Sequence, residues 1–327
     1  IQSIDETVSN INIRGGSNDQ NLILWDDIKM YQSGHFFGLI SMYNPHITQK
    51  VALQKNGSSA AYTDGVSGTI AMSTDKKINP DTNGSISINL IDANGYIDLP
   101  LGENASIQVA ARKSISDFFE TPTYSEYFDR ITQDTEISAN VDTITNSDIK
   151  FDFYDTSLRL LMQPTDKDFL RFNFIYTADQ VVFNESAVVN TSEEVRESSL
   201  DQNSIAGSLY YLRKWNPNMT TEFSIYETDY KLRAINSNVL QEQRFLQENV
   251  VSETGVRAVV KNKIYENFEW RNGYHFVETK ITNLDDVDDP IFRRLESEVL
   301  RTHGIFSEID WSTPNNNTSV NAGIRFN

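Results

Sequence analysis

The sequence contains no cysteine and is poor in basic residues. Because cysteine is absent from all 327 positions, neither a disulfide framework nor a thiolate metal site can form. The 28 Lys and Arg are outnumbered by 46 Asp and Glu, and the formal net charge of -18 argues against a nucleic-acid partner. No run of about 18 apolar residues occurs, which excludes a helical membrane protein. The chain begins without Met or a signal-like segment, so we expect a fragment of a longer protein.

Beyond residue 80 the chain alternates between short polar turns and longer polar segments. The predicted turns are 101–106, 163–168, 216–220, 263–267 and 313–318. The longer segments, which we interpret as loops, are 115–148, 179–200, 235–247 and 283–297. Between them lie predicted strands of about 10 to 17 residues, and short turns at one end with long loops at the other are typical of an outer-membrane β-barrel.

Apolar and polar side chains also alternate along several predicted strands, as expected when one face meets lipid and the other water. Segments 170–177, 250–261 and 267–276 follow this pattern, and in the last one Trp270 and Tyr274 share a face opposite Arg271 and His275. Residues 151–162 break phase, which predicts a bulge near Asp155. A soluble β-sandwich would alternate too, but its strands are shorter.

Residues 1–75 carry three successive motifs that point to a small separate unit. The first is Arg14, Gly15 and Gly16, followed by Asp19, Gln20, Asn21 and Asp26. The second contains Tyr31, His35, Phe37, Gly38, Asn44 and Pro45. The third contains Gly57, Tyr62, Ser67 and Gly68. In this order the motifs resemble the plug domain of TonB-dependent outer-membrane receptors, especially the Bacteroidetes type.

This resemblance implies a mainly β fold with two parts. Residues 1–75 would form a small α+β plug domain, truncated at its N-terminus. Residues 76–327 would form part of an antiparallel transmembrane β-barrel with long extracellular loops, contributing about ten strands of about 22 in a plugged receptor barrel. The bacterial outer membrane would be the location.

The sequence departs from the family pattern at the first plug hairpin. Asp26-Asp27 stands where the family usually has Asp-Gly, so a side chain must be tolerated at a position where glycine freely takes positive φ. An arginine that many relatives carry after the tyrosine corresponding to Tyr62 is also missing, and only Arg14 remains of a pair that contacts acids of the barrel wall. We therefore expect the electrostatic attachment of the plug to be weaker or differently placed.

The resemblance also suggests which plug residues meet a ligand. The candidates at the plug apices are Asn18, Asp19, Gln20, Tyr31, His35 and Phe36. Their aromatic faces and polar tips suit a polar organic ligand. Two alternatives stay open: the aromatic residues fill the plug core, or the polar ones form an ordinary solvated turn. The expected structural residues of the plug are Arg14, Gly15, Gly16, Asp26, Gly38, Asn44, Pro45, Gly57, Tyr62 and Gly68.

No pattern in the sequence indicates a cofactor, a metal site or an enzyme. The four histidines show no spacing that would place two on one face. The acidic segment 283–290 lacks the glycine and terminal Glu of a Ca²⁺-binding EF-hand loop, which favours a solvated loop. No nucleophile-elbow motif occurs.

The function that the resemblance implies is import of an external ligand, driven through TonB by the proton-motive force. TonB would act on an N-terminal segment absent from this chain. The ligand would be a siderophore, cobalamin, glycan or peptide, and the further partners would be the lipid bilayer and, for glycans or peptides, a SusD-like surface lipoprotein. The alternative is an adhesin-like surface binding or scaffold protein that transports nothing.

Overall fold

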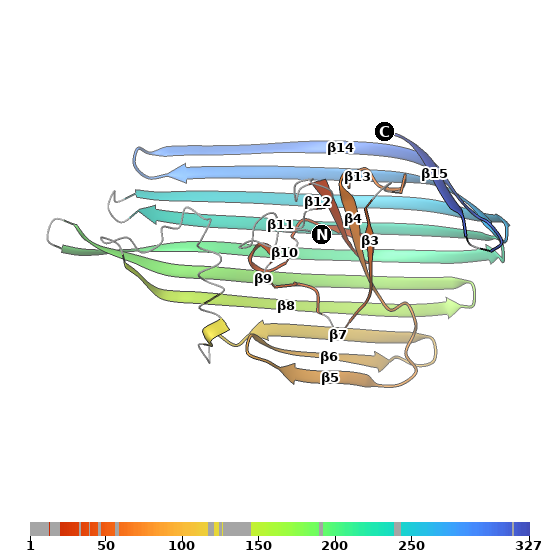
Figure 1. Cartoon of the computed structure of the whole chain (residues 1–327), viewed down its shortest axis with the longest axis horizontal. Helices are drawn as coiled ribbons and strands as arrows, with labels where there is room; N and C mark the ends of the chain where they lie inside the picture. The colour runs from red at the N-terminus through yellow and green to blue at the C-terminus, as the bar shows by residue number, and fades with distance from the viewer. Residues whose placement is uncertain are drawn as a thin grey trace.

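The chain forms two β-sheets in the computed structural model (Figure 1). The structure describes residues 13, 20–32, 34–38, 40–44, 47–55, 59–116, 121–123, 126, 145–189, 192–238, 243–315 and 317–327. We call the four-stranded sheet β1–β4 the plug sheet and the eleven-stranded sheet β5–β15 the wall sheet.

The plug sheet is mixed. Its strands are β1 (Asn21–Trp25), β2 (Ile28–Met30), β3 (Thr48–Gln54) and β4 (Gly68–Thr74), in the order β2-β1-β4-β3. β1 pairs parallel with β4, and the other pairs are antiparallel. A 3-10 turn, η2 (Phe36–Gly38), follows β2.

The hairpin between β1 and β2 turns on Asp26 and Asp27 alone. Both take positive φ, of 47° and 72°, as the two central residues of a type I′ turn must. Aspartate tolerates this left-handed region better than most residues with a Cβ. The turn therefore forms without the glycine of the family pattern, and it leaves two carboxylates at its tip.

The wall sheet is antiparallel throughout, and each strand pairs with its neighbours in the chain. It has eleven described strands where the sequence suggested about ten. They are β5 (Asn83–Ile88), β6 (Asp92–Pro100), β7 (Ala105–Ser114), β8 (Thr145–Thr165), β9 (Asp168–Val189), β10 (Ser192–Asn216), β11 (Met219–Asn238), β12 (Gln243–Tyr265), β13 (Phe268–Val287), β14 (Phe292–Ser312) and β15 (Ser319–Phe326).

The short turns lie where they were predicted, but three of the four predicted long loops are wrong. Segments 179–200, 235–247 and 283–297 belong mostly to paired strands, and β8 to β14 each contain 20 to 25 residues. Polar sequence was taken for loop, whereas opposite charges on neighbouring strands stabilise a ladder. Asp286 and Arg293, for example, lie directly opposite each other, with 3.6 Å between Oδ2 and Nη1. The fourth predicted loop, 115–148, lies mostly outside the described residues, between the end of β7 at Ser114 and the start of β8 at Thr145.

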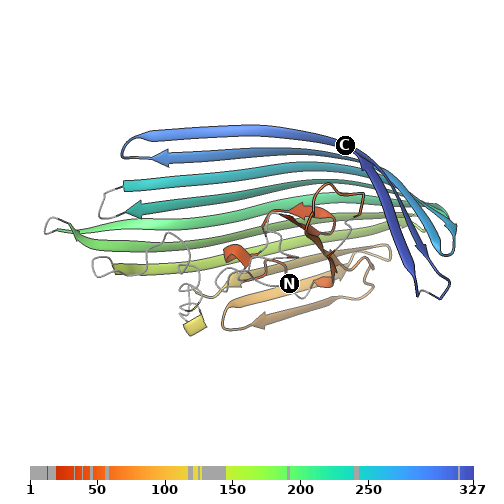
Figure 2. The same cartoon turned by 45° about the horizontal axis from the view of Figure 1, so that its top comes forward.

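The wall sheet curves around the plug sheet, which lies on its concave side (Figure 2). The predicted alternation holds there: Arg171, Asn173 and Thr177 of β9 face the plug and are at most 1% exposed, while Phe172 between them is 41% exposed on the other face. The concave face is therefore the polar one, as the barrel interpretation requires.

The predicted bulge near Asp155 is wrong. The pairing of β7 with β8 runs without a break through Arg112↔Asp155. Phe153, Asp155 and Ser157 are all buried on the concave face. Phe151 and Phe153 of β8 point inward, and the plug ring of Phe36 stacks on Phe151, with 3.7 Å between the ring centroids.

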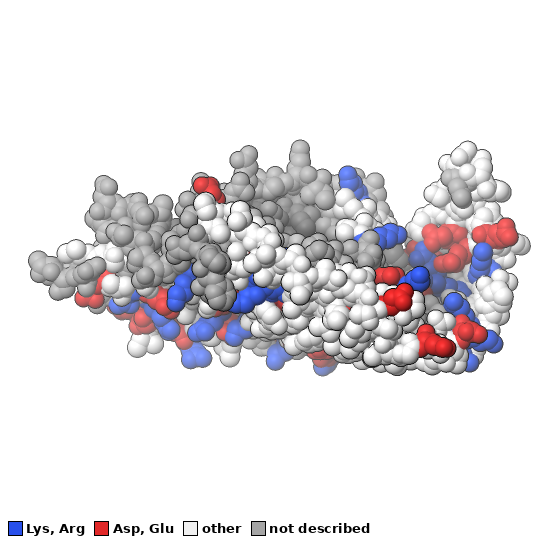
Figure 3. All heavy atoms as spheres, turned by 90° about the horizontal axis from the view of Figure 1, so that it is seen from below, with Lys and Arg blue, Asp and Glu red and all other residues white. Residues whose placement is uncertain are grey.

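The convex face carries an apolar band. Tyr211, Phe223, Ala258, Tyr274, Ile305 and Phe326 are successive cross-strand neighbours over β10 to β15. Seen from below in Figure 3, Lys, Arg, Asp and Glu gather toward the two ends of the molecule, and a broad area of other residues lies between them. Crossing the hydrocarbon layer takes about 9–11 residues of a tilted strand, so strands of this length continue well beyond it. No helix in the described ranges is long and apolar enough to span a membrane.

Candidate functional site: the plug–wall interface

The plug and the wall share one hydrophobic core. Trp25, Ile28 and Met42 of the plug cluster with Ile175 and Tyr226 of the wall, and all five are at least nine-tenths buried. Burial of this kind stabilises the assembly without fixing its orientation, because the hydrophobic effect is not directional. The orientation is set by buried polar contacts between the two sheets, which are described next.

The first contact is made by Asp26 at the tip of the plug hairpin. Its carboxylate accepts hydrogen bonds from the backbone N–H and the Oγ1 of Thr74, at 2.9 and 2.6 Å. From the wall, Arg171 Nη1 donates at 3.3 Å and Asn173 Nδ2 at 3.0 Å. The Asp26 side chain is fully buried, so it joins plug strand β4 to wall strand β9 with every bond charge-assisted. The structural role predicted for Asp26 is consistent with these bonds.

The second contact is made by Asp27. Its Oδ1 lies 3.3 Å from Arg257 Nη2 and accepts a hydrogen bond from the Tyr62 hydroxyl at 3.2 Å, while its Oδ2 lies 3.5 Å from Arg171 Nη2. Burial opposes ionisation of Asp27, but Arg257 and Arg171 outweigh it and hold the pKa of this carboxyl below its usual range. Burial raises the pKa of Tyr62 to about 12, so its hydroxyl stays protonated as a donor.

These two contacts reverse the polarity expected from the family pattern. Here acids of the plug pair with arginines of the wall. The Asp26-Asp27 turn presents two carboxylates to the wall arginines, whereas an Asp-Gly turn would present only one. Arg14 lies outside the described residues.

The third contact gathers four donors around Glu253 of β12, whose side chain is 1% exposed. The hydroxyls of Tyr31, Tyr226 and Thr279 donate to it at 2.6, 2.7 and 2.8 Å. The ammonium of Lys29 adds a bond at 3.4 Å. Tyr31, predicted to meet a ligand, thus donates its hydroxyl to the wall, and burial together with Glu253 raises its pKa.

The fourth contact is made by His35 and Phe36. The imidazole of His35 is buried between two wall carboxylates: Nε2 lies 3.2 Å from Asp155 Oδ2, and Nδ1 lies 3.1 Å from Asp179 Oδ2. Phe36 is 1% exposed and stacks on Phe151. Both side chains of this predicted apex are therefore packed against the wall, in line with the core alternative for Phe36.

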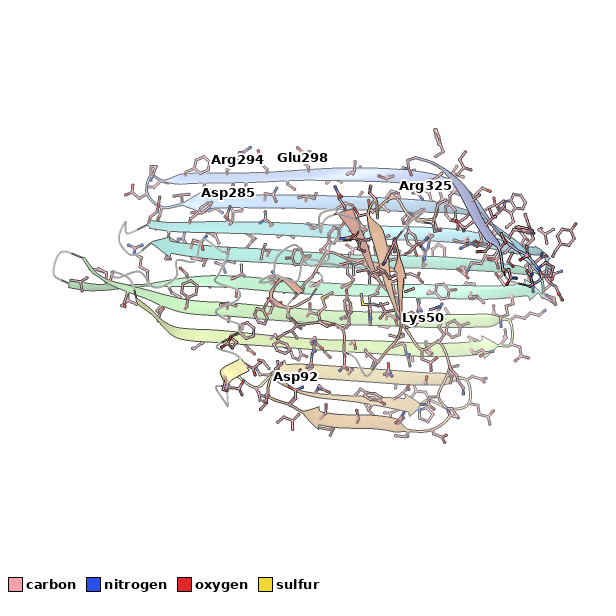
Figure 4. The ribbon with its side chains drawn as sticks, in the orientation of Figure 1. Lys50, Asp92, Asp285, Arg294, Glu298 and Arg325 are labelled. Atoms are coloured by element: carbon pink, nitrogen blue, oxygen red, sulfur yellow. The ribbon has the colours of Figure 1, made fainter. Side chains whose placement is uncertain are left out.

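A fifth contact fastens the plug near the end of the wall sheet. Glu308 of β14 accepts hydrogen bonds from Ser59 Oγ at 2.6 Å and from the Ala60 backbone N–H at 2.8 Å. Arg325 of β15, labelled beside the plug in Figure 4, donates to the Ala60 carbonyl at 3.2 Å. Two of these three bonds involve the Ala60 backbone, so this contact depends little on which side chains the plug carries there.

The other predicted residues fall into two groups. Gln20 is exposed and accepts a hydrogen bond from Ser67 Oγ at 3.0 Å, Asn44 is buried, and Gly38 takes a φ of 93°. Gly68 lies so close to Ile13 that a Cβ would come within 2.8 Å of it. The predicted residues that lie outside the described part of the chain are Arg14, Gly15, Gly16, Asn18, Asp19, Pro45 and Gly57.

Beyond the plug, the extended parts of β13 and β14 carry Asp285, Arg294 and Glu298, labelled in Figure 4. The acidic segment 283–290 is not one solvated loop: Asp285 accepts from Gln247, while Asp286 on the opposite face pairs with Arg244. Within the described ranges, no group of three or more His, Asp or Glu side chains is arranged to hold a metal ion.

Sequence reasoning missed the wall half of this interface. No role in holding the plug was predicted for Arg171, Arg257, Glu253, Asp155 and Asp179, although all five lie on the inward face of their strands. The available signal was a charged residue at a lumen-facing position near the middle of a long strand.

Together, the fold and the interface define an outer-membrane barrel wall with an internal plug. Residues 2–70 match the family described as the TonB-dependent receptor plug domain. The chain also has the fold of the solved outer-membrane receptors named below. It carries a TonB-dependent receptor plug domain, and the protein is located in the bacterial outer membrane.

Two of these structures are mutants of the ferric enterobactin receptor PfeA of Pseudomonas aeruginosa. They give TM-scores of 0.65 and 0.62 at 14% and 13% identity, covering 95% and 94% of this chain and 50% and 49% of theirs. The ferric yersiniabactin uptake receptor FyuA of Yersinia pestis gives 0.55 at 10% identity, covering 94% of this chain and 56% of its own. The chain thus spans about half the length of these receptors. No curated protein matches it in sequence.

Proposed function

We propose that the receptor containing this chain imports an external ligand by a TonB-coupled rearrangement of its plug. The observation that carries the proposal is the interface itself: the plug lies on the concave side of the wall and is held there by separate polar contacts through Asp26, Asp27, Glu253 and His35. Such contacts keep the lumen closed at rest and can be exchanged for water when the plug is pulled. Ligand binding and TonB recruitment should then favour each other, because coupling between two sites is reciprocal.

The domain division that goes with this proposal is a plug over 1–75 and a partial barrel over 76–327. As ligand we propose a ferric siderophore first, supported by the receptors named above that share the fold. Cobalamin, glycans and peptides are the other classes to test, the last two together with a SusD-like lipoprotein. Among the proposed apex residues, Gln20 is exposed, whereas His35 and Phe36 would meet a ligand only after leaving the wall.

Two measurements on the complete receptor test the proposal. Deleting residues 1–75 should turn a closed pore into a conducting one in planar bilayers in KCl solution. Uptake of labelled ferric siderophores, cobalamin, oligosaccharides and peptides should then be compared in cells with and without functional TonB. Uptake of one class that requires TonB supports the proposal. Ligand binding with no TonB-dependent uptake would favour the non-transporting binding protein, and unchanged conductance after the deletion would refute the plug.

A further inference from the structure

His35 occupies an unusual position at the junction of four elements. It precedes η2 of the plug and lies between Asp155 of β8 and Asp179 of β9, with no exposed surface. Arg112 of β7 donates from Nε to the same Oδ2 of Asp155, at 2.7 Å, and from Nη2 to the Ser41 carbonyl of the plug. The site therefore ties one plug segment to three neighbouring wall strands.

The contacts of the two ring nitrogens indicate how many protons the His35 imidazole carries. A neutral imidazole has one N–H and one lone pair, so it can donate to only one of two carboxylates. Here Nδ1 and Nε2 both lie within hydrogen-bonding distance of a carboxylate oxygen, at 3.1 and 3.2 Å. With a neutral ring, one nitrogen lone pair would face a carboxylate oxygen in a buried site, where such an unpaired contact is costly. With both nitrogens protonated, each carboxylate accepts a bond.

Charge balance points the same way. When both are ionised, Asp155 and Asp179 together carry two negative charges, while Arg112 supplies one positive charge. Protonated His35 supplies the second, so the buried cluster becomes neutral. Asp179 also accepts hydrogen bonds from Gln32 of the plug, at 2.9 Å, and from the Phe36 backbone. Tyr230 of β11 interacts with it electrostatically, and none of these groups adds a positive charge.

We propose that His35, with Asp155 and Asp179, is a proton-binding site that fastens the plug to the wall. The bound proton makes the His35 ring the second positive group of the cluster, beside Arg112 and opposite the two carboxylates. Without this proton, the hydrogen bond between the imidazole and one of the carboxylates is lost. The site thus makes this part of the plug–wall contact dependent on protonation. It does not depend on which ligand the receptor takes or on whether transport occurs.

The direction of the pH dependence follows from the sign of the shift. Burial opposes the charged ring, but the two carboxylates outweigh burial and raise the pKa of His35 above its ordinary value of 6.5. Stability from this contact is then fully present below pH 6.5 and is lost as the pH rises through the raised value. The plug segment should be firmly held below pH 6.5 and loosen as the pH rises through the raised value.

The test uses the complete receptor, labelled with ¹⁵N-histidine, in lipid nanodiscs. The ring signals of His35 are assigned by their loss in His35→Gln, and their shifts report whether one or both nitrogens carry hydrogen. We expect an imidazolium below pH 6.5 and a midpoint above that value. Asp179→Asn should lower that midpoint. A midpoint at or below 6.5, or one that Asp179→Asn leaves unchanged, would overturn the proposal.

A second readout follows the contact itself. Hydrogen exchange at the His35 amide, which donates to the Ile40 carbonyl at 2.7 Å, should be at least tenfold faster in Asp179→Asn than in the wild type at pH 6, after correction for intrinsic rates. The matched control is His303→Gln, because His303 bonds Tyr274 on the convex face and should leave the exchange unchanged. Equal exchange in Asp179→Asn and the wild type would refute a fastening role.

Discussion

Replacing Arg171 by Met gives the sharpest test of the plug–wall interface. Arg171 and Asp26 are 1% and 0% exposed, so neither charge can be solvated in place once its partner is gone. Breaking a buried ion pair by removing one partner costs about 3–5 kcal/mol. Asn173 and Thr74 still donate to Asp26 in the variant, so we take the lower figure, about 3 kcal/mol. Since about 1.4 kcal/mol is a factor of ten, the population of the opened plug should rise by roughly 100-fold.

Hydrogen exchange of the complete receptor in nanodiscs measures this population directly. The informative amide is that of Asp26, which donates to the Met72 carbonyl at 2.9 Å inside the plug. The control is Arg213→Met, which removes an arginine from another wall ion pair, with Asp168, at a partly exposed site. Exposed pairs contribute little, so the control should change exchange by less than about tenfold. Equal exchange in the two variants would refute the argument that Arg171 holds the plug.

Three further predictions concern the same interface. The depressed pKa of Asp27 gives the plug stability that is fully present above pH 3.8 and is lost as the pH falls through the depressed value. The plug amides should therefore exchange faster in acid. Asp27→Asn, which keeps the left-handed turn, should abolish this dependence. Glu253→Leu should destabilise plug strand β2 by about 1–3 kcal/mol for each of the Tyr31 and Tyr226 hydroxyls that loses its acceptor, while Lys29 keeps Asp64 as an ion-pair partner. Thr279→Val, which removes one donor, should have a smaller effect in the same exchange measurement. Gly255→Ala should lower the thermal unfolding midpoint, because its Cβ would come within 2.2 Å of the Tyr226 ring and reduce the free energy of unfolding by about 1–3 kcal/mol. Gly207→Ala is the control: the nearest atom to its Cβ is 3.5 Å away, so the midpoint should stay unchanged.

Local patterns were sufficient for the architecture. The alternation around Arg171 and Phe172 predicted which face meets the plug, and short polar clusters such as 163–168 predicted the tight turns. Both signals arise within a few residues, because strand periodicity and turn chemistry are local properties. The long strands were missed for a related reason: a charged segment looks the same whether it is solvated or paired with opposite charges on the next strand.

The interface could not be read in the same way. Asp26 and Arg171 are 145 positions apart, and nothing near either residue indicates its partner. Tyr31 and His35 have the side chains expected of a ligand site, but the same hydrogen-bonding tips serve equally well against a carboxylate of the wall. The choice between these uses depends on strand register, which only the assembled sheet provides.

The length of the paired strands has a consequence for selectivity. The ladder between β9 and β10 is continuous to Val189 and Ser192, and the ladder between β13 and β14 is continuous to Val287 and Phe292. Loops that fold over a guest molecule lose conformational entropy when they close, whereas a hydrogen-bonded rim has already lost it during folding. Under the proposed import function, the mouth formed by these two hairpins should therefore discriminate by a fixed shape. Exchanging the hairpin tips should then alter which molecules enter more than how tightly the rim closes on them.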